Sequence, residues 1–137
     1  MTSIKAFFAQ RAKDMSRGDF STFVAAISYP IVAYVGTRRL FFQDQESTQR
    51  ILQTHCENLQ VEGLCDIKAD VIYECPGPCG LAQVFVEWRY LNAKGGLISQ
   101  LDASYFVQAG SKGEWYIVNV ELLREPVPRF SAGIPIE

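Results

Sequence analysis

Acidic side chains at matching positions on neighbouring strands are the residues whose types and spacing point most directly to chemistry. The predicted strands, joined by turns around Lys94–Gly95 and Gly110–Gly113, are Leu81–Leu91, Ile98–Gln108 and Trp115–Leu123. If both hairpins are unbulged, Glu87 lies opposite Asp102, and Asp102 lies opposite Glu121. Like charges in such a row cost stability, so the row indicates a shared proton, a nearby cation or a functional demand.

Two further residues could complete a catalytic site around this row. Arg89 follows Glu87 on the same face and supplies a cation. In an apolar pocket, burial and like charge would both favour the protonated form of Asp102, which makes it the first catalytic candidate, as acid or base. His55, on a helix above the pocket, could act as the complementary base or hydrogen-bond a ligand carbonyl. The alternatives are an ion-paired network that only stabilises the sheet, and a core histidine bonded to backbone.

The alternation of side chains divides these strands into two faces of different character. The first face is wholly apolar or aromatic and consists of Val84, Val86, Trp88, Tyr90, Leu101, Ala103, Tyr105, Val107, Tyr116, Val118, Val120 and Leu122. The second face carries the charged residues. It also supplies the candidate ligand contacts Phe85, Phe106, Trp115, Ile117, Asn119 and Glu121, to which an earlier strand adds Tyr34.

We expect the helices to cover the second face and to form with it a pocket for a small hydrophobic ligand. The wholly apolar face then needs a partner, because soluble monomers rarely expose large apolar patches, and this predicts a homodimer through the sheet. The reverse arrangement would leave the acids in the interface or in solvent.

The earlier part of the chain supplies the elements that position the strands. Helical periodicity predicts three helices, which begin after the N-cap residues Ser3, Asp19 and Asp44. His55 falls on the apolar stripe of the third helix and is expected to be buried. Segments rich in β-branched and aromatic residues predict strands at Ile31–Val35, Arg39–Phe42 and Asp66–Glu74. The inward side chains of the last of these strands are expected to be Ile67, Ala69, Val71 and Tyr73.

Length and composition favour one globular domain, and the predicted helices followed by strands make it an α+β domain. The chain has 137 residues, of which 48% are hydrophobic and 20% charged, and its net charge is −2. We expect a single domain at 1–124 followed by a Pro-containing extended arm at 125–137. The absence of a basic stripe argues against nucleic-acid binding, and the N-terminal segment fits neither a signal peptide nor a membrane span. The cytoplasm is the expected location.

The four cysteines are too few for a disulfide scaffold, and we interpret them as reduced thiols. Cys75 and Cys79 flank Pro-Gly-Pro and resemble half of a metal site, but the chain has no second closely spaced pair. We therefore expect a turn with thiols at its shoulders, no metal and no cofactor, although oxidation could join the two thiols.

The order helix, helix, hairpin, helix and four long strands resembles the nuclear transport factor two-like superfamily. The local marks of this resemblance are Ser16–Arg17–Gly18–Asp19–Phe20 and Gly113–Glu114–Trp115–Tyr116–Ile117, and its extent is about Ser3–Arg124. It implies a cystatin-like roll, in which a cone-shaped, mostly antiparallel sheet wraps around three N-terminal helices. The superfamily includes ketosteroid isomerase, SnoaL-like polyketide cyclases, limonene epoxide hydrolase and many binding modules, so the fold alone does not settle function.

The resemblance also bears on single residues. Asp102 falls where the isomerase has its protonated oxyanion-hole aspartate, but Arg11 stands where that enzyme needs a tyrosine, and Ala33–Tyr34 where it needs its base. Steroid isomerisation by that mechanism is therefore not expected. Glu87, Arg89 and Asp102 match in residue type the acid–arginine–acid set of the hydrolase. Asp102 alone could serve as the single pocket aspartate of the cyclases.

Three functions follow from these observations. The first is a cofactor-free acid–base isomerase, cyclase, dehydratase or hydrolase that acts on a small hydrophobic molecule, with Asp102 as acid or base. The second is a dimeric module that binds an apolar ligand without turnover. The third is an accessory subunit that docks on another protein through its apolar sheet face or its Pro-rich tail.

Overall fold

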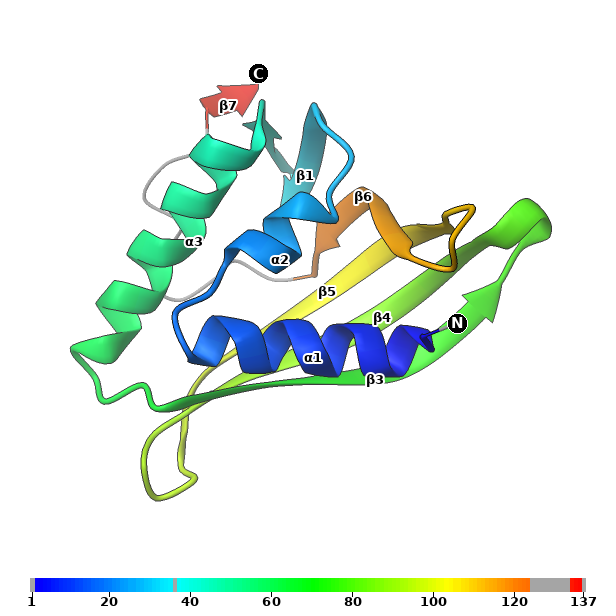
Figure 1. Cartoon of the computed structure of the whole chain (residues 1–137). Helices are drawn as coiled ribbons and strands as arrows, with labels where there is room; N and C mark the ends of the chain where they lie inside the picture. The colour runs from blue at the N-terminus through cyan, green and yellow to red at the C-terminus, as the bar shows by residue number, and fades with distance from the viewer. Residues whose placement is uncertain (1, 36, 124–133, 137) are drawn as a thin grey trace.

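Three α-helices lie on one side of a curved sheet in the computed structural model, which describes residues 2–35, 37–123 and 134–136 (Figure 1). Helix α1 spans Ile4–Ser16, and the Ser3 hydroxyl accepts a hydrogen bond of 3.0 Å from the Ala6 amide, as expected of its N-cap. Helix α2 spans Ser21–Ala25. The predicted cap of this helix, Asp19, lies one residue outside the cap position, but its carboxylate still accepts a hydrogen bond from the Ser21 amide.

The first hairpin and the third helix follow the sequence pattern closely. Strand β1 spans Ile31–Val35 and strand β2 spans Arg38–Phe42, and the two pair antiparallel. Helix α3 spans Gln45–Gln60, and the carboxylate of its N-cap Asp44 accepts a hydrogen bond of 2.9 Å from the Ser47 amide. The three predicted helices are thus confirmed.

The sheet has seven strands among the residues described, in the order β3-β4-β5-β6-β1-β2-β7. Its remaining members are β3 (Asp66–Pro76), β4 (Leu81–Leu91), β5 (Leu97–Ala109), β6 (Trp115–Leu122) and β7 (Ile134–Ile136), with a short 3-10 helix η1 (Pro78–Gly80) between β3 and β4. Neighbouring strands are antiparallel except β1 and β6. The sheet is curled around the helices rather than closed (Figure 1). This is the α+β roll expected from the sequence.

Part of the predicted C-terminal arm adds to the sheet. Strand β7 pairs antiparallel with β2, so residues 134–136 form an edge strand rather than a free extended segment. The other residues of the arm, 125–133 and 137, lie outside the described residues.

Three β-bulges or irregularities, one in each of the pairings β3–β4, β4–β5 and β5–β6, change the register that an unbulged sheet would have. Between β4 and β5 the predicted pairing of Glu87 with Asp102 is confirmed. Between β5 and β6 the register set at the turn and a bulge between Phe106 and Val107 together place Glu121 opposite Ser104, so the prediction that Glu121 faces Asp102 is wrong. The acid row instead runs onto β3, where Asp70 pairs with Glu87.

The bulges also move side chains between the faces, because one extra residue inverts the alternation beyond it. Ile117 is fully buried, whereas Val118, predicted on the wholly apolar face, has 40% of its surface exposed. Tyr116 of the same predicted face is exposed as well. In β3 the register shifts between Val71 and Tyr73, and the predicted inward Tyr73 is 55% exposed.

The helices cover the apolar face of the sheet, so the predicted assignment of the two faces is reversed. The inward side chains, all buried, include Val84, Val86, Trp88, Tyr90, Leu101, Ala103, Tyr105, Val107 and Leu122. Burying one such aliphatic or aromatic side chain contributes about 1.5–3 kcal/mol, whereas burying an unpaired carboxylate costs several kcal/mol. The apolar face therefore packs inward, and Glu87, Arg89 and Asp102 lie on the outer face.

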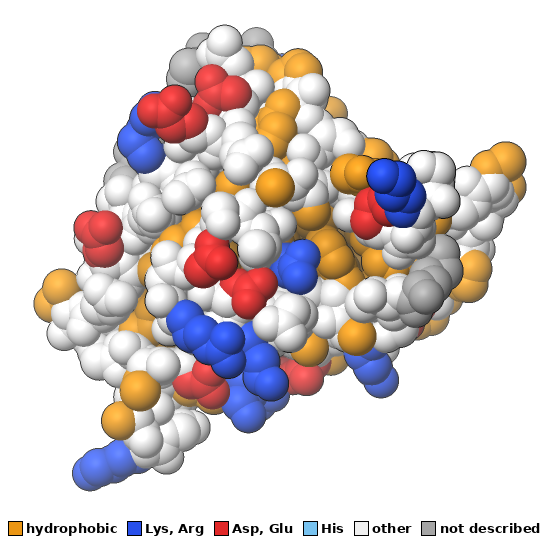
Figure 2. Space-filling model, in the orientation of Figure 1, with side chains coloured by type: hydrophobic (Ala, Val, Ile, Leu, Met, Phe, Trp, Pro, Cys, Tyr) orange, Lys and Arg blue, Asp and Glu red, His pale blue; other side chains and the backbone are white. Residues whose placement is uncertain are grey.

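The surface carries charges of both signs. In the view of Figure 2, acidic and basic side chains are interspersed over the side of the molecule that includes α1, in keeping with a net charge of −2. No helix within the described ranges is long and apolar enough to cross a membrane.

Candidate ligand-binding cavity

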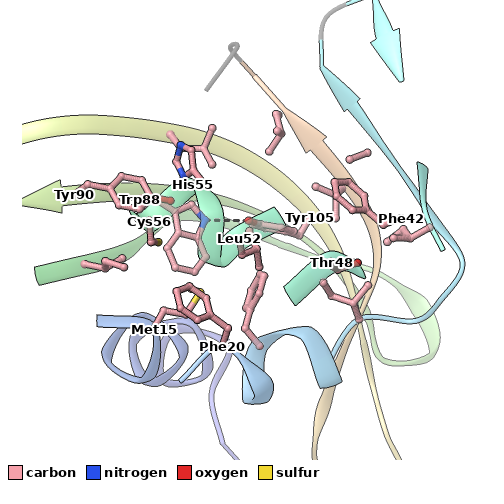
Figure 3. Close-up of a pocket in the computed structure, with 18 residues that line it drawn as sticks. Met15, Phe20, Phe42, Thr48, Leu52, His55, Cys56, Trp88, Tyr90 and Tyr105 are labelled. Carbon is pink, nitrogen blue, oxygen red and sulfur yellow. Dashed lines mark hydrogen bonds between the residues drawn. The ribbon is translucent and has the colours of Figure 1, made fainter. Parts of the chain in front are cut away.

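A cavity of about 80 Å³ lies between the helices and the inner face of the sheet (Figure 3). Each of the three α-helices contributes to its wall, with Met15 from α1, Phe23 from α2 and Leu52 from α3 among the lining residues. The sheet closes the other side with Leu101 and Val120 among its members. Because these walls are apolar, the few polar atoms that reach the cavity decide what it can bind.

Tyr105 of β5 and Trp88 of β4 supply the best-defined polar group. The Trp88 indole N–H donates a hydrogen bond of 2.9 Å to the Tyr105 hydroxyl oxygen (Figure 3). Phe8 packs against both rings, with its ring centroid 5.1 Å from that of Tyr105 and 6.1 Å from that of Trp88. These contacts hold the phenol in one orientation.

The Tyr105 hydroxyl is a hydrogen-bond donor in this setting. Burial raises its pKa well above the ordinary value, although the hydrogen bond from Trp88 partly opposes that shift. The phenol is therefore neutral at physiological pH. Since its oxygen accepts the indole hydrogen, its own hydrogen points elsewhere and can be donated to a ligand.

His55, Cys56 and Tyr90 form a second polar group in the cavity wall. His55 of α3 is 3% exposed, which confirms that it lies on the buried stripe, and its ring meets Tyr90 edge to face at 5.7 Å. Burial raises the pKa of the Cys56 thiol to about 11, with a smaller effect from the charge of Glu57. Burial also raises the pKa of Tyr90, and Cys56 and Tyr105 add to that shift. The thiol and both phenols are neutral near pH 7.

The predicted acid–arginine cluster lies on the outer face, and none of its members lines the cavity. An Arg89 terminal nitrogen lies 2.6 Å from an Asp70 carboxylate oxygen, and the Arg89 Nε lies 3.7 Å from a Glu87 oxygen. Asp102 accepts a hydrogen bond of 3.0 Å from Gln100. The sheet thus separates these side chains from His55, and the structure does not bring the predicted catalytic residues together.

The predicted ligand contacts also lie outside the cavity, and most of them belong to the face that is turned away from the helices. Ile117 does not belong to that face, because the bulge in β6 turns its side chain into the packed core. The predicted contacts that line neither the cavity nor the core are Tyr34, Phe85, Phe106, Asn119 and Glu121. Trp115 packs at the edge of the core and donates a hydrogen bond of 2.7 Å to the Thr2 carbonyl oxygen.

Trp88, Tyr90 and Tyr105 were not predicted as site residues, although the sequence held a signal for them. All three belong to the apolar face and carry a polar atom on an aromatic ring. Their side chains also stay on the inner face of the sheet despite the bulges. A polar tip in an apolar layer needs a partner or a ligand.

The cysteines offer no metal site among the described residues, where no group of three or more His, Cys, Asp or Glu side chains could hold an ion. Cys75 and Cys79 are exposed free thiols on either side of the turn between β3 and β4.

Comparison with solved structures identifies the fold. A domain of unknown function with a cystatin-like fold from Nostoc punctiforme PCC 73102 aligns with a TM-score of 0.66 over 89% of this chain and 75% of that chain, at 21% identity. A nuclear transport factor two-like protein of unknown function from Shewanella oneidensis MR-1 gives 0.63 over 85% and 92% of the two chains, at 12% identity. A ketosteroid isomerase-like protein from Erwinia carotovora atroseptica SCRI1043 gives 0.56 over 89% and 96%, at 13% identity.

No protein-family model and no curated protein matches the sequence. The likeness lies in the arrangement of helices and strands, as these low identities require, and it agrees with the element order and the curled sheet described above. This chain therefore has the nuclear transport factor two-like, or cystatin-like, α+β fold.

Proposed function

We propose that this protein binds a small, mostly apolar molecule that carries a hydrogen-bond acceptor such as a ketone carbonyl. The Tyr105 hydroxyl carries the proposal, because it is a neutral donor held in place by Trp88 in the wall of an otherwise apolar cavity. An acceptor on the ligand would satisfy this donor, whereas a purely apolar ligand would leave it unsatisfied at a cost of about 1–3 kcal/mol.

The size of the cavity limits the ligand. Its volume of about 80 Å³ is roughly half that of the ~150 Å³ cavity that accepts benzene in an engineered protein. It is also below the ~300–1,000 Å³ of ordinary ligand pockets. Butanone, a compact ketone, is therefore a suitable probe. A larger ligand would require the walls to move or a side chain to be shortened.

The proposal is tested by titrating butanone while following the indole N–H signal of Trp88. We expect a saturable shift of this signal, and we expect Tyr105→Phe to weaken the binding about tenfold, because one hydrogen bond to a neutral group contributes about 0.5–1.5 kcal/mol. Tyr116→Phe, which alters an exposed tyrosine outside the cavity, is the matched control. Equal affinity in the Tyr105 variant and the wild type would refute a role for this donor.

The enlarged variant Leu101→Ala tests the size limit. Leu101 lines the cavity and is 6% exposed, so shortening it adds space at the ligand site. We expect this variant to bind cyclohexanone, which the wild type excludes. Equal binding of cyclohexanone by both proteins would place the ligand somewhere else.

Acid–base catalysis is the second candidate function. The observation that favours it is that His55, a possible base, and Tyr105, a possible donor to a developing oxyanion, line the same cavity. Such a pair would remove a proton from the carbon next to the ketone and return one from solvent. In deuterated water this exchanges the α-hydrogens of butanone for deuterium. Turnover requires catalysed exchange that His55→Gln abolishes, whereas saturable binding without catalysed exchange identifies a binding module.

Catalysis by Asp102, with Glu87 and Arg89, stays a prediction without support from the cavity geometry.

Homodimer formation also stays a prediction, but the surface proposed for it from sequence is buried under the helices. A dimer through a face of the sheet would have to use the outer face, where the rings of Tyr73 and Phe85 lie 5.9 Å apart. Sedimentation velocity of the wild type and of Tyr73→Glu measures whether that face holds two copies together.

A further inference from the structure

A second hollow, separate from the cavity, lies between α1, α2 and the start of β6. It encloses about 510 Å³, which falls within the ~300–1,000 Å³ typical of small-molecule sites. It shares no lining residue with the cavity. Figure 2 shows a hollow on this side of the molecule with apolar side chains on its floor and a basic side chain beside it. We call it the Arg11 groove, after the lining residue that carries the positive charge.

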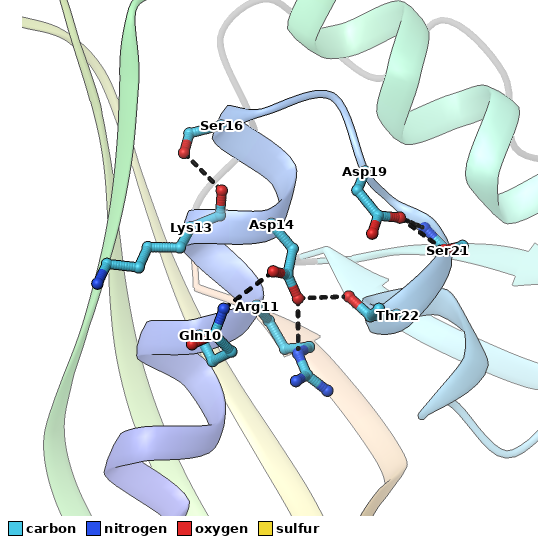
Figure 4. Close-up of polar contacts among 8 residues, drawn as sticks. All are labelled: Gln10, Arg11, Lys13, Asp14, Ser16, Asp19, Ser21 and Thr22. Atoms are coloured by element: carbon cyan, nitrogen blue, oxygen red, sulfur yellow. Dashed lines mark hydrogen bonds and ion pairs between the residues drawn. The ribbon is translucent and has the colours of Figure 1, made fainter.

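Arg11 is fixed in the wall of this groove. Its guanidinium carbon lies 5.1 Å from the centroid of the Phe7 ring, and its Nε lies 3.4 Å from an Asp14 carboxylate oxygen. The Arg11 side chain is 24% exposed. Figure 4 shows that the two terminal nitrogens point away from Asp14. The edge of the guanidinium that can bind a carboxylate with two parallel hydrogen bonds is thus turned away from its internal partner.

Asp14 acts as a positioning residue for Arg11. Gln10 and Thr22 donate hydrogen bonds of 3.0 and 2.8 Å to its two oxygens (Figure 4). Burial by itself would raise the pKa of Asp14, but these hydrogen bonds and the charges of Arg11 and Arg17 outweigh it, so the pKa lies below its ordinary value. Asp14 is therefore ionised and tied to two elements, α1 and α2. This arrangement reduces the freedom that Arg11 would lose on binding a ligand.

Aromatic side chains supply the apolar part of the groove. Phe7 lies under the guanidinium, and Trp115 and Tyr116 lie at the start of β6. The hydrogen bond from the Trp115 indole to the Thr2 carbonyl oxygen holds this ring against the start of α1. Rigid aromatic walls next to a bidentate donor match a ligand that is flat, apolar and acidic at one end.

We propose that the Arg11 groove binds an aromatic monocarboxylate. The carboxylate accepts two hydrogen bonds from the terminal nitrogens of Arg11, and the ring packs against Trp115 and Tyr116. Glu114 also lines the groove, so a second carboxylate on the ligand is repelled, and a neutral or cationic group in its place is tolerated. Asp14 and Glu114 together carry more negative charge than Arg11 carries positive charge. Selectivity for a carboxylate therefore comes from the two parallel hydrogen bonds that the Arg11 guanidinium can donate, and not from long-range attraction.

The two tryptophans of the chain allow the two sites to be followed separately, because Trp88 lines the cavity and Trp115 lines the groove. The experiment titrates benzoate into the ¹⁵N-labelled protein and follows both indole N–H signals, assigned with Trp115→Phe. We expect a saturable shift of the Trp115 signal and none of the Trp88 signal. Terephthalate should bind more weakly than benzoate.

Arg11→Gln should weaken benzoate binding at least about tenfold, which corresponds to about 1.4 kcal/mol. Arg50→Gln is the matched control, since it makes the same charge change at an exposed residue of α3 outside the groove. Unchanged affinity in Arg11→Gln, or the absence of a saturable shift in the wild type, would overturn the proposal. If Arg11→Gln does not fold, wild-type protein still decides the matter, because equal affinity for benzoate and the neutral benzyl alcohol rejects a carboxylate site.

Discussion

The buried thiol of Cys56 gives the protein a stability that should decline in alkaline solution by a calculable amount. Cys56 is 7% exposed, lines the cavity, and has a pKa raised by burial from 9.0 to about 11. Between these two values the unfolded chain releases the thiol proton while the folded chain keeps it. The unfolded state is therefore favoured progressively as the pH rises. Below pH 9 both states are protonated, and the contribution is fully present.

The magnitude follows from the two pKa values. Relative to neutral pH, the expected loss is about 1.4 kcal/mol at pH 10 and about 2.3 kcal/mol at pH 11, and the full shift of about two units corresponds to ~2.7 kcal/mol. Other groups also titrate in this range, so the loss attributable to Cys56 is the difference between the wild type and Cys56→Ala. At neutral pH the wild type should be the more stable protein, because the variant loses buried sulfur, and this advantage should shrink as the pH rises.

Urea unfolding at several pH values between 8 and 11, with a reductant present, measures the effect. Cys65→Ala removes an exposed thiol and controls for the loss of a thiol as such. If the stability difference between the wild type and Cys56→Ala is the same at pH 8 and pH 10.5, the thiol is not desolvated as described, and the account of an apolar cavity wall around it is wrong.

Three further variants test the packing and the surface by urea unfolding. Asp44→Ala should lower the free energy of unfolding by about 1 kcal/mol, because the Ser47 amide at the start of α3 loses its capping acceptor; no change would show that this cap does not hold the helix. Arg89→Met should change the free energy of unfolding by less than about 1 kcal/mol, because the paired side chains of Arg89 and Asp70 are 36% and 51% exposed. A larger loss would reveal a structural role for the cluster on the outer face. Leu59→Ala should cost about 2–5 kcal/mol, because Leu59 is fully buried, and a loss below 1 kcal/mol would contradict its core position.

Local signals in the sequence were sufficient for much of the fold. Ser3 and Asp44 act as the predicted N-caps, and β1 pairs with β2 as the predicted hairpin. These features depend on interactions between residues that are close along the chain or joined by one tight turn. Alternation and turn length therefore specify them directly.

The faces of the sheet were harder to predict because they depend on contacts between distant residues. Both faces carry aromatic side chains, so aromatic content does not distinguish them. The row of charged residues led to the prediction that the face with Asp102 lies under the helices. The apolar side chains decide the matter in the structure, since burying them against the helices contributes more than burying carboxylates could. The bulges after Phe106 and Val71 reverse which side chains point inward in parts of β6 and β3. No turn residue in the sequence indicates where these bulges lie.

The reversed faces change the candidate site more than they change the fold. His55 was predicted on the correct side, as part of the buried stripe of α3. Its neighbours in the cavity are Tyr90, Tyr105 and Trp88 in place of Asp102 and Arg89. The chemistry that the cavity can offer is thereby shifted from carboxylate acid–base pairs to neutral hydrogen-bond donors around one imidazole.

The position of a bound ketone tests the central claim most directly. Nuclear Overhauser effects between butanone protons and protein side chains should connect the ligand to Met15, Leu101 and the ring of Tyr105, which line the cavity under the helices. Contacts to Phe85 or Phe106 on the outer face, with none to Tyr105, would contradict the account and return the ligand site to the face that carries Asp102.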